Sequence, residues 1–176
     1  KDFYYIGGEN ARYVYFLDNL NLENGKVSLH QLNSAGNIKS TSISLTSVIK
    51  KLGAFEIADL ELINVVTTDK ALVHVFRHHD SKAKKYTDIA TFITHHNFLP
   101  YATILGETTE EGLKSGKLSH WEFIGFTEDE ICFSAMDHLG KNKGWTVNTY
   151  TSKAALKNTQ LITSSANYTS VSHSEI

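Results

Sequence analysis

Two histidine pairs, His78-His79 and His95-His96, are the residues of this chain whose type and spacing could bind a metal ion. The strand predicted to end at His79 would pair with the strand predicted to end just before His95, and His78 would then face about Tyr86. His95 lies about nine residues further along that partner strand, which at about 3.3 Å per residue puts it about 30 Å from His78. Neighbouring residues of a strand also point to opposite faces, so neither pair can chelate alone. We therefore expect no metal site and no cofactor.

Other catalytic motifs are incomplete. His120-Trp121-Glu122 matches half of a zinc deaminase signature, but the half with two cysteines is absent because Cys132 is the only cysteine. The sequence has no G-x-S-x-G nucleophile elbow, no phosphate-binding loop and no G-x-G-x-x-G fingerprint. Carboxylates near Cys132 would raise the pKa of its thiol, and apolar neighbours would bury it. We interpret Cys132 as a core residue and not as a nucleophile.

His74 shares a face of its predicted strand with Leu72 and Phe76. That position suits a hydrogen-bonded core residue or, alternatively, a half-buried general base. A toxin-like hydrolase or nuclease would combine His74 or His78 with a lysine of the next loop: Lys82, Lys84 or Lys85. The chain has 17 Lys and Arg against 19 Asp and Glu, whereas nucleic-acid binding requires a surplus of cations. The sequence favours a non-enzymatic protein with no nucleic-acid partner, and the histidine-dependent enzyme is the alternative.

Aromatic residues on the predicted strands are the candidate binding residues. A sheet with one solvated face must expose some of them, and exposed Tyr and Trp are favoured contact residues at interfaces. Plain core packing is the other interpretation. We predict a surface for a protein or another surface ligand, formed by Tyr4, Tyr13, Tyr15 and Trp121.

Strand patterns dominate the elements that must position these residues. Alternating apolar residues and turn residues predict strands at 3–6, 11–18, 26–32, 38–45, 60–67, 71–79, 86–94, 98–105, 120–126 and 145–151. Asn24-Gly25 favours a two-residue type I′ turn, in which both residues have positive φ. A short helix is predicted over residues 46–52, capped by Thr46 or Ser47.

The segment from Thr127 to Gly140 predicts the longest helix. Thr127 and Glu130 match a capping box, and three acidic residues suit the positive end of a helix dipole. One apolar stripe would contain Ile131, Ala135, Met136 and Leu139. We therefore predict an α+β fold: a mainly antiparallel sheet of six to nine strands, able to curl, with one longer packed helix near 128–139. Residues 1–151 would form one domain, and the polar residues 152–176 a partly flexible extension.

Composition limits the class of protein. Apolar residues make up 41% of the 176 residues and charged residues 20%, which excludes global disorder. The longest apolar runs fall short of the ~18 residues of a membrane span, and one cysteine permits no internal disulfide. Abundant Ser, Thr and Asn are common in secreted proteins. Because the chain begins with Lys1, we expect any targeting signal or lipid anchor to precede the given sequence.

The order of elements resembles the bacterial surface-adhesin protein E family, small outer-membrane lipoproteins. The resemblance covers about residues 1–140. It depends on Phe3-Tyr4-Tyr5-Ile6-Gly7, on Tyr15-Phe16-Leu17-Asp18, and on Trp121-Glu122-Phe123-Ile124 leading to Thr127 and Cys132. The second cysteine of that family, the partner of Cys132, is missing. The resemblance implies an antiparallel sheet with a packed helix, an outer-membrane address and a binding role.

These observations predict a non-enzymatic binding or adhesion module of an exported bacterial protein, in the periplasm, in the outer membrane or at the cell surface. Two other hypotheses stay open at this point: the histidine-dependent hydrolase or nuclease, and a structural subunit of a larger assembly such as a phage or pilus component. The sequence identifies neither the ligand nor the oligomeric state.

Overall fold

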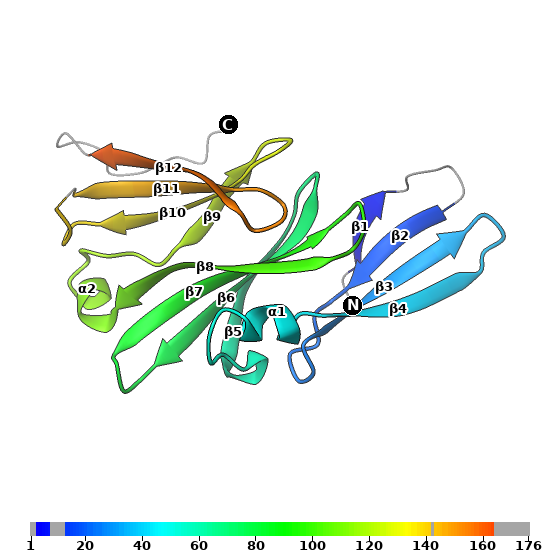
Figure 1. Ribbon diagram of the computed structural model, residues 1–176, viewed down its shortest axis with the longest axis horizontal. Helices are drawn as coiled ribbons and strands as arrows, with labels where there is room; N and C mark the ends of the chain where they lie inside the picture. Colours follow the sequence, from blue (N-terminus) through cyan, green and yellow to red (C-terminus); the bar gives the residue numbers. More distant parts are fainter. Residues whose placement is uncertain (1–2, 8–12, 142, 164–176) are drawn as a thin grey trace.

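Residues 3–7, 13–141 and 143–163 are described by the computed structural model, and they form three four-stranded antiparallel sheets (Figure 1). The first sheet contains β1 (Phe3–Gly7), β2 (Tyr13–Asp18), β3 (Lys26–Asn33) and β4 (Ile38–Ser44). The second contains β5 (Leu60–Thr67), β6 (Ala71–Asp80), β7 (Lys85–Thr94) and β8 (Pro100–Thr109). The third contains β9 (Glu122–Phe126), β10 (Ile131–Asp137), β11 (Gly144–Tyr150) and β12 (Leu156–Thr163). The helical segments of the described residues are α1 (Thr46–Lys50), η1 (Ile57–Asp59) and α2 (Glu110–Lys114).

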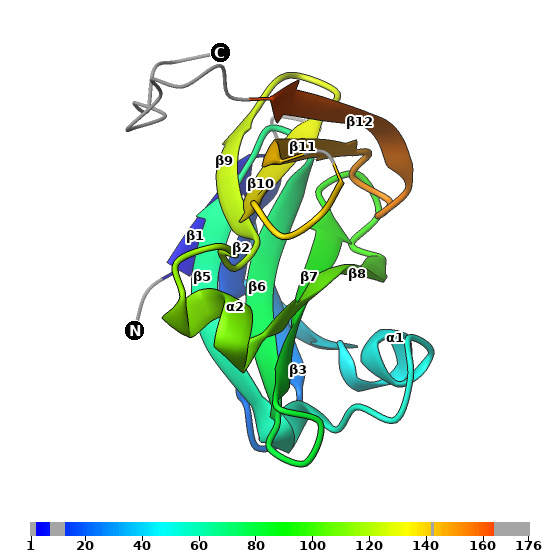
Figure 2. The same cartoon turned by 90° about the vertical axis from the view of Figure 1, so that its left-hand side faces the viewer.

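All three sheets follow the same plan. Strands that are consecutive in the chain lie side by side in each sheet, so each sheet is a meander. Figure 2 shows that β1, β5 and β9 lie along one side of the molecule, whereas β8 and β12 lie along the other. The three sheets therefore stack in the same orientation, each with its first strand on the same side.

The second sheet lies between the other two, and both of its faces are buried. Leu72 and Phe76 of β6 belong to a core shared with the first sheet. Val73 and Val75 point to the other face of β6 and belong to a core shared with the third sheet. Side chains alternate between the faces of a strand, so a strand that is buried on both faces needs a continuous apolar run. Residues 71–76 of β6 and 89–93 of β7 are apolar except at His74 and Thr91, which are both buried and lie opposite each other.

The predicted hairpin of β6 and β7 is confirmed. Ala71 lies opposite Thr94, and His79 lies opposite Tyr86. His78 faces Thr87, one residue further along than Tyr86, the partner expected from the sequence. The two histidine pairs therefore lie at opposite ends of this hairpin. Within the described ranges, no group of three or more His, Cys, Asp or Glu side chains is arranged to hold a metal ion.

The prediction of an α+β fold with a longer helix near residues 128–139 is wrong. Of the described residues, 59% are in strands and 9% are helical, and strand β10 occupies the predicted helix. Ile131 and Ala135 are four residues apart. Residues with this spacing share a face in a strand as well as in a helix. Phe133 distinguishes the two patterns, because it is fully buried in the same core as Ile131. The fold is mostly β.

The acidic segment before β10 is a turn and not a helix start. The Thr127 N–H donates to the Glu130 carbonyl at 2.9 Å, which closes the turn between β9 and β10. The Glu130 carboxylate lies 2.7 Å from Lys157 of β12. The residues of the capping-box pattern therefore form the turn that connects β9 to β10, and they do not cap a helix.

The type I′ turn predicted at Asn24-Gly25 is also wrong. Residues 22–25 form a four-residue turn in which the Gly25 N–H donates to the Asn21 carbonyl at 2.8 Å. Gly25 has φ +66°, whereas Asn24 does not have positive φ. A Cβ atom on Gly25 would lie 2.5 Å from Thr46 Oγ1. The turn therefore needs positive φ at one residue, Gly25, and there is no room for a side chain at that position.

The remaining elements differ from the predictions at their ends. The predicted short helix is present as α1, but Leu45 occupies its N-cap position and no side chain caps it. Leu156–Thr163 pairs with β11 as the edge strand of the third sheet, which the sequence did not predict. Residues 164–176 of the predicted extension lie outside the described residues. None of the helical segments described has the length and apolar character of a membrane span.

Candidate functional site

An aromatic ledge lies at one end of the seam between the first and second sheets; its residues are Tyr13, Tyr15, Gln31 and Phe98, and Leu99 follows Phe98 in the chain. Tyr13 and Tyr15 are two residues apart in β2 and share a face. The Tyr15 ring centroid lies 6.5 Å from that of Tyr13 and 5.1 Å from that of Phe98. The Gln31 amide donates to the Tyr15 hydroxyl at 3.4 Å. Together these side chains form a continuous aromatic surface with one amide group.

The ledge extends a buried core to the surface. Leu17 follows Tyr15 on the same face of β2 and is fully buried between the two sheets. Exposure increases along β2 away from Leu17: Tyr15 is partly buried, and Tyr13 is 41% exposed. Leu99 is 49% exposed. The inner end of the ledge is therefore fixed by packing, while its outer end is open to a partner.

Phe98 has an unfavourable backbone conformation, with φ +57°. A bulky residue in this left-handed region costs about 1–2 kcal/mol. The turn between β7 and β8 maintains it, because the Phe98 N–H donates to the Thr94 carbonyl at 2.8 Å and the Leu99 N–H donates to the Thr94 hydroxyl at 3.3 Å. Strain of this kind is concentrated at functional sites. In this conformation of the turn, the Phe98 ring lies against Tyr15.

The structure brings together some of the predicted binding residues and separates others. Tyr13 and Tyr15 form the ledge, and Tyr4 lies opposite Leu17 and packs against the same core. Trp121 lies in the other seam, where it packs against the core of the second and third sheets. Its indole nitrogen covers Gly106, where a Cβ atom would have no room.

The two histidines of the alternative enzyme site do not form a common cavity. His74 is fully buried and faces the first sheet beside Thr91, with its Nδ1 3.5 Å from the Thr91 hydroxyl. Burial lowers the pKa of His74 to about 4, so the ring is neutral at pH 7. His78 lies four residues further along β6 and contacts the edge of Phe55 with ring centroids 5.2 Å apart. Solvent does not reach the His74 ring, so the two imidazoles do not line a common solvent-filled cavity.

A polar cluster that the sequence analysis did not identify lies between the second and third sheets. Asp88 is fully buried and accepts from Arg77 Nε at 2.8 Å and from the Trp121 N–H at 2.9 Å. His120 Nδ1 lies 3.5 Å from Asp88 Oδ2, the oxygen that accepts from the Trp121 N–H. Burial and, after it, the charge of Arg77 lower the pKa of His120. One signal was present in the sequence: Asp88 directly precedes the apolar residues Ile89 and Ala90 in a predicted strand, and charged residues are rarely fully buried without a partner.

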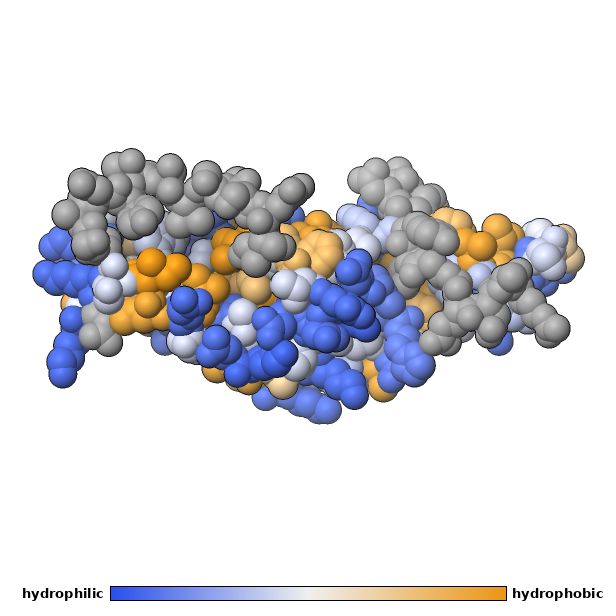
Figure 3. All heavy atoms as spheres, turned by 90° about the horizontal axis from the view of Figure 1, so that it is seen from above, coloured by the Kyte–Doolittle hydropathy of each residue, from blue (hydrophilic) through white to orange (hydrophobic). Residues whose placement is uncertain are grey.

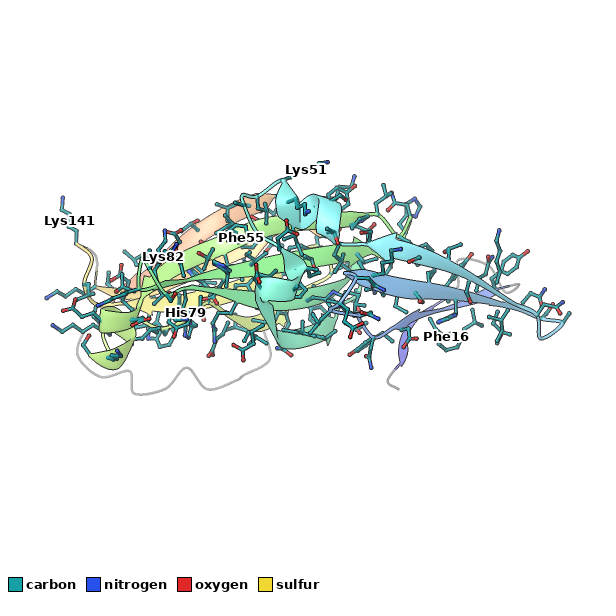
Figure 4. All side chains as sticks on the ribbon, turned by 90° about the horizontal axis from the view of Figure 1, so that it is seen from below. Phe16, Lys51, Phe55, His79, Lys82 and Lys141 are labelled. Carbon is teal, nitrogen blue, oxygen red and sulfur yellow. The ribbon has the colours of Figure 1, made fainter. Side chains whose placement is uncertain are left out.

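Tyr86 connects this cluster to the surface. Its ring stacks on His79 with centroids 4.4 Å apart and meets His120 edge-on at 5.1 Å. His79 Nε2 lies 2.7 Å from Glu110 of α2, and this hydrogen bond lowers the pKa of the Glu110 carboxyl. In Figure 4, His79 lies at the far end of the molecule from Phe16 of the first sheet.

The cluster has the parts of a general base without an adjacent nucleophile. The nearest hydroxyl in sequence, that of Ser119, donates to the His120 carbonyl and accepts from the Met136 N–H. The bond from Met136 joins the segment before β9 to the third sheet. The Thr108 hydroxyl of β8 donates to the Ser119 carbonyl at 3.3 Å and joins the same segment to the second sheet. We interpret the cluster around Asp88 as a clasp between two sheets, because each of its polar contacts crosses between elements.

Comparison of the chain with protein-family models, with curated proteins and with solved structures finds no match in any of the three. The resemblance to the protein E family therefore stays a prediction. The packed helix that this resemblance implies between Thr127 and Gly140 is replaced by a turn and strand β10.

Proposed function

We propose that the protein is a non-enzymatic binding module that holds a partner protein on the aromatic ledge. The observation that carries this proposal is the strained conformation of Phe98, which supports an aromatic surface where a relaxed turn would cost less. Tyrosine and phenylalanine offer a large contact area with few rotatable bonds, so little entropy is lost when a partner binds them.

The exposed ends of the ledge are the expected energetic centre of the contact. Tyr13 is 41% exposed beside the partly buried ring of Tyr15, and Leu99, the next residue after Phe98 in the chain, is 49% exposed. Truncation of a well-packed tyrosine at an interface typically costs 2 kcal/mol or more, a factor of about 30 in Kd. The proposal assigns the module to an exported bacterial protein because Ser, Thr and Asn fill its polar positions. Fractionation of the source cells, with the protein found only in the cytosol, would contradict this assignment.

A library of random peptides displayed on phage tests the binding role. Peptides selected on the wild-type chain should bind Tyr13→Ala and Leu99→Ser at least tenfold more weakly. Ile63→Ser is the matched control, because Ile63 is 38% exposed on β5 and lies outside the ledge. The absence of selected peptides, or equal affinity for the ledge variants and the wild type, would contradict the proposal.

An activity screen addresses the enzymatic alternative. Purified protein is incubated with RNA and with nucleotides, and the products are followed by chromatography. The proposal expects no turnover above buffer. Turnover that is lost in His78→Ala would support the histidine-dependent hydrolase or nuclease and overturn the non-enzymatic function.

A further inference from the structure

The polar side chains beside the aromatic ledge lie on the same face of the first sheet as its tyrosines. Asn33 of β3 lies opposite Tyr13, and Gln31 lies opposite Tyr15. Lys39 of β4 lies opposite Gln31. Residues that are directly opposite in an antiparallel sheet share a face, so one surface carries two phenol rings, two carboxamides and an ammonium group.

This end of the first sheet extends beyond the second sheet. In Figure 1, the turn between β3 and β4 points away from the strands of the second sheet. Figure 3 shows apolar side chains at the surface over this end of the molecule. Tyr13 and Lys39 are exposed, and Gln31 and Asn33 are half-buried. A ligand on this surface would therefore contact the rings and the polar groups together.

The polar groups of this surface have hydrogen-bond donors to spare. The Asn33 side-chain oxygen accepts from the Ala35 N–H at 3.0 Å and from the Asn37 N–H at 2.9 Å. These bonds orient the carboxamide and leave its NH₂ group without a partner among the described residues. The Tyr15 hydroxyl oxygen accepts from Gln31, and within the same described ranges its own proton has no acceptor. Both groups are therefore available to a ligand.

The described residues of this face include no carboxylate. On β2, β3 and β4, those that share the face of Tyr15 contain neither Asp nor Glu. The turn residues 95–99, which include Phe98, also contain neither. A complementary ligand is therefore rich in hydrogen-bond acceptors and poor in donors, and it has apolar groups to place on the rings.

A proline-rich segment in the polyproline II conformation has these properties. This helix has no internal hydrogen bonds, so its backbone carbonyls are free to accept, and proline has no N–H. Two residues of the helix span about 6 Å. The ring centroids of the ledge lie at similar distances, 6.5 Å between Tyr13 and Tyr15 and 5.1 Å between Tyr15 and Phe98. Grooves lined by aromatic side chains bind such segments in other protein domains.

Two other ligand classes match this surface less well. The hydroxyl groups of a sugar donate as well as accept, and the described face has no carboxylate to accept from them. An extended peptide that adds a strand to a sheet pairs with the backbone of an edge strand. Tyr13 and Tyr15 lie on β2, which is an inner strand of its sheet.

We propose that the aromatic ledge binds a proline-rich segment of its partner in the polyproline II conformation. This inference rests on the proposed function and specifies its ligand. The rings of Tyr13, Tyr15 and Phe98 hold the proline rings, and the Tyr15 hydroxyl and the Asn33 amide donate to backbone carbonyls of the segment. Because proline-rich chains already populate this conformation when free, little entropy is lost when they bind.

Titration of the full chain with a capped peptide of about ten prolines tests the proposal. Binding should be saturable, and its NMR chemical-shift changes should be largest at the ledge. Tyr13→Ala should weaken binding at least tenfold. Tyr15→Phe keeps the ring and removes only the donor, and it should weaken binding at least threefold. Ile63→Ser on β5 is the control variant and should bind as the wild type does.

A capped glycine-serine peptide of the same length is the control ligand. It offers as many backbone carbonyls as the proline peptide, but it has no proline rings and no preformed helix, so it should bind at least tenfold more weakly. Equal affinity for the two peptides, or equal affinity of Tyr15→Phe and the wild type for the proline peptide, would overturn the proposal. Circular dichroism of each variant checks that its sheets are retained.

The random peptide library separates this inference from the proposed function. Peptides selected on the wild type should be enriched in proline. Selected peptides that bind the ledge without this enrichment, together with a proline peptide that does not bind, would overturn the polyproline II ligand and leave the binding role intact. Failure of both the library and the proline peptide to bind would overturn both proposals.

Discussion

Replacement of His74 by leucine should remove part of the acid sensitivity of this protein. His74 is fully buried among apolar side chains, and burial lowers its pKa from 6.5 to about 4. Above pH 6.5 the ring is neutral in the folded and the unfolded chain. As pH falls from 6.5 to about 4, the unfolded chain binds a proton that the folded chain does not, so the free energy of unfolding decreases.

The size of this effect follows from the two pKa values. A difference of about 2.5 at 1.36 kcal/mol per pKa unit corresponds to about 3 kcal/mol when the loss is complete. Most of this loss, about 2–3 kcal/mol, should be present near pH 4.5. Urea denaturation of the wild type and of His74→Leu at pH 7 and near pH 4.5 measures it. Other titrating groups are common to both proteins and cancel in the comparison.

The expected result is that the wild type loses about 2–3 kcal/mol more than His74→Leu between these two pH values. Equal losses would refute the reasoning, since His74 would then bind its proton equally well in the folded and unfolded chains. A difference confined to pH above 6.5 would also refute it.

Three further predictions concern stability and reactivity. Asp88→Ala should cost about 3–5 kcal/mol in urea denaturation, because it removes the fully buried partner of the partly buried Arg77 guanidinium. A cost below about 1 kcal/mol would show that the clasp contributes little. Gly25→Ala should lower Tm more than Gly36→Ala: both glycines have positive φ, but only at Gly25 would a Cβ meet other side chains. Equal Tm values would contradict the close approach of Thr46. Cys132 is 6% exposed and burial raises the pKa of its thiol, so Ellman's reagent should label it only after denaturant is added, and rapid labelling of the folded chain would place it in solvent.

Local sequence was sufficient for the hairpins and insufficient for the segment after Thr127. Strand-forming residues and the turn residues between them predicted β6 and β7, because both signals are local in the sequence. For residues 131–137, the spacing of Ile131 and Ala135 agrees with a helix and with a strand. Phe133 carried the deciding information, but its role depends on the core of the second sheet, which lies about 40 residues earlier in the chain.

In the candidate sites, too, local contacts could be predicted from the sequence and contacts between distant segments could not. The spacing of Tyr13 and Tyr15 alone puts them on one face, so this part of the ledge was predictable. Phe98 was assigned to a strand, and its contact with Tyr15 depends on a positive φ in a turn far along the chain. The clasp joins Asp88 of the second sheet to His120 in the segment before β9, and no local pattern connects these residues.

The sequence by itself determined that the chain is rich in antiparallel strands, where most of its turns fall, and which tyrosines share a face. These features depend on the alternation of neighbouring side chains and on turn residues, which are local. The tertiary structure alone decided that the strands form three stacked sheets, that residues 131–137 extend and do not coil, and that Phe98 and Asp88 reach their partners. The physical reason is that each of these outcomes depends on the burial of one face against another sheet, and a single segment contains no information about the surface that will cover it.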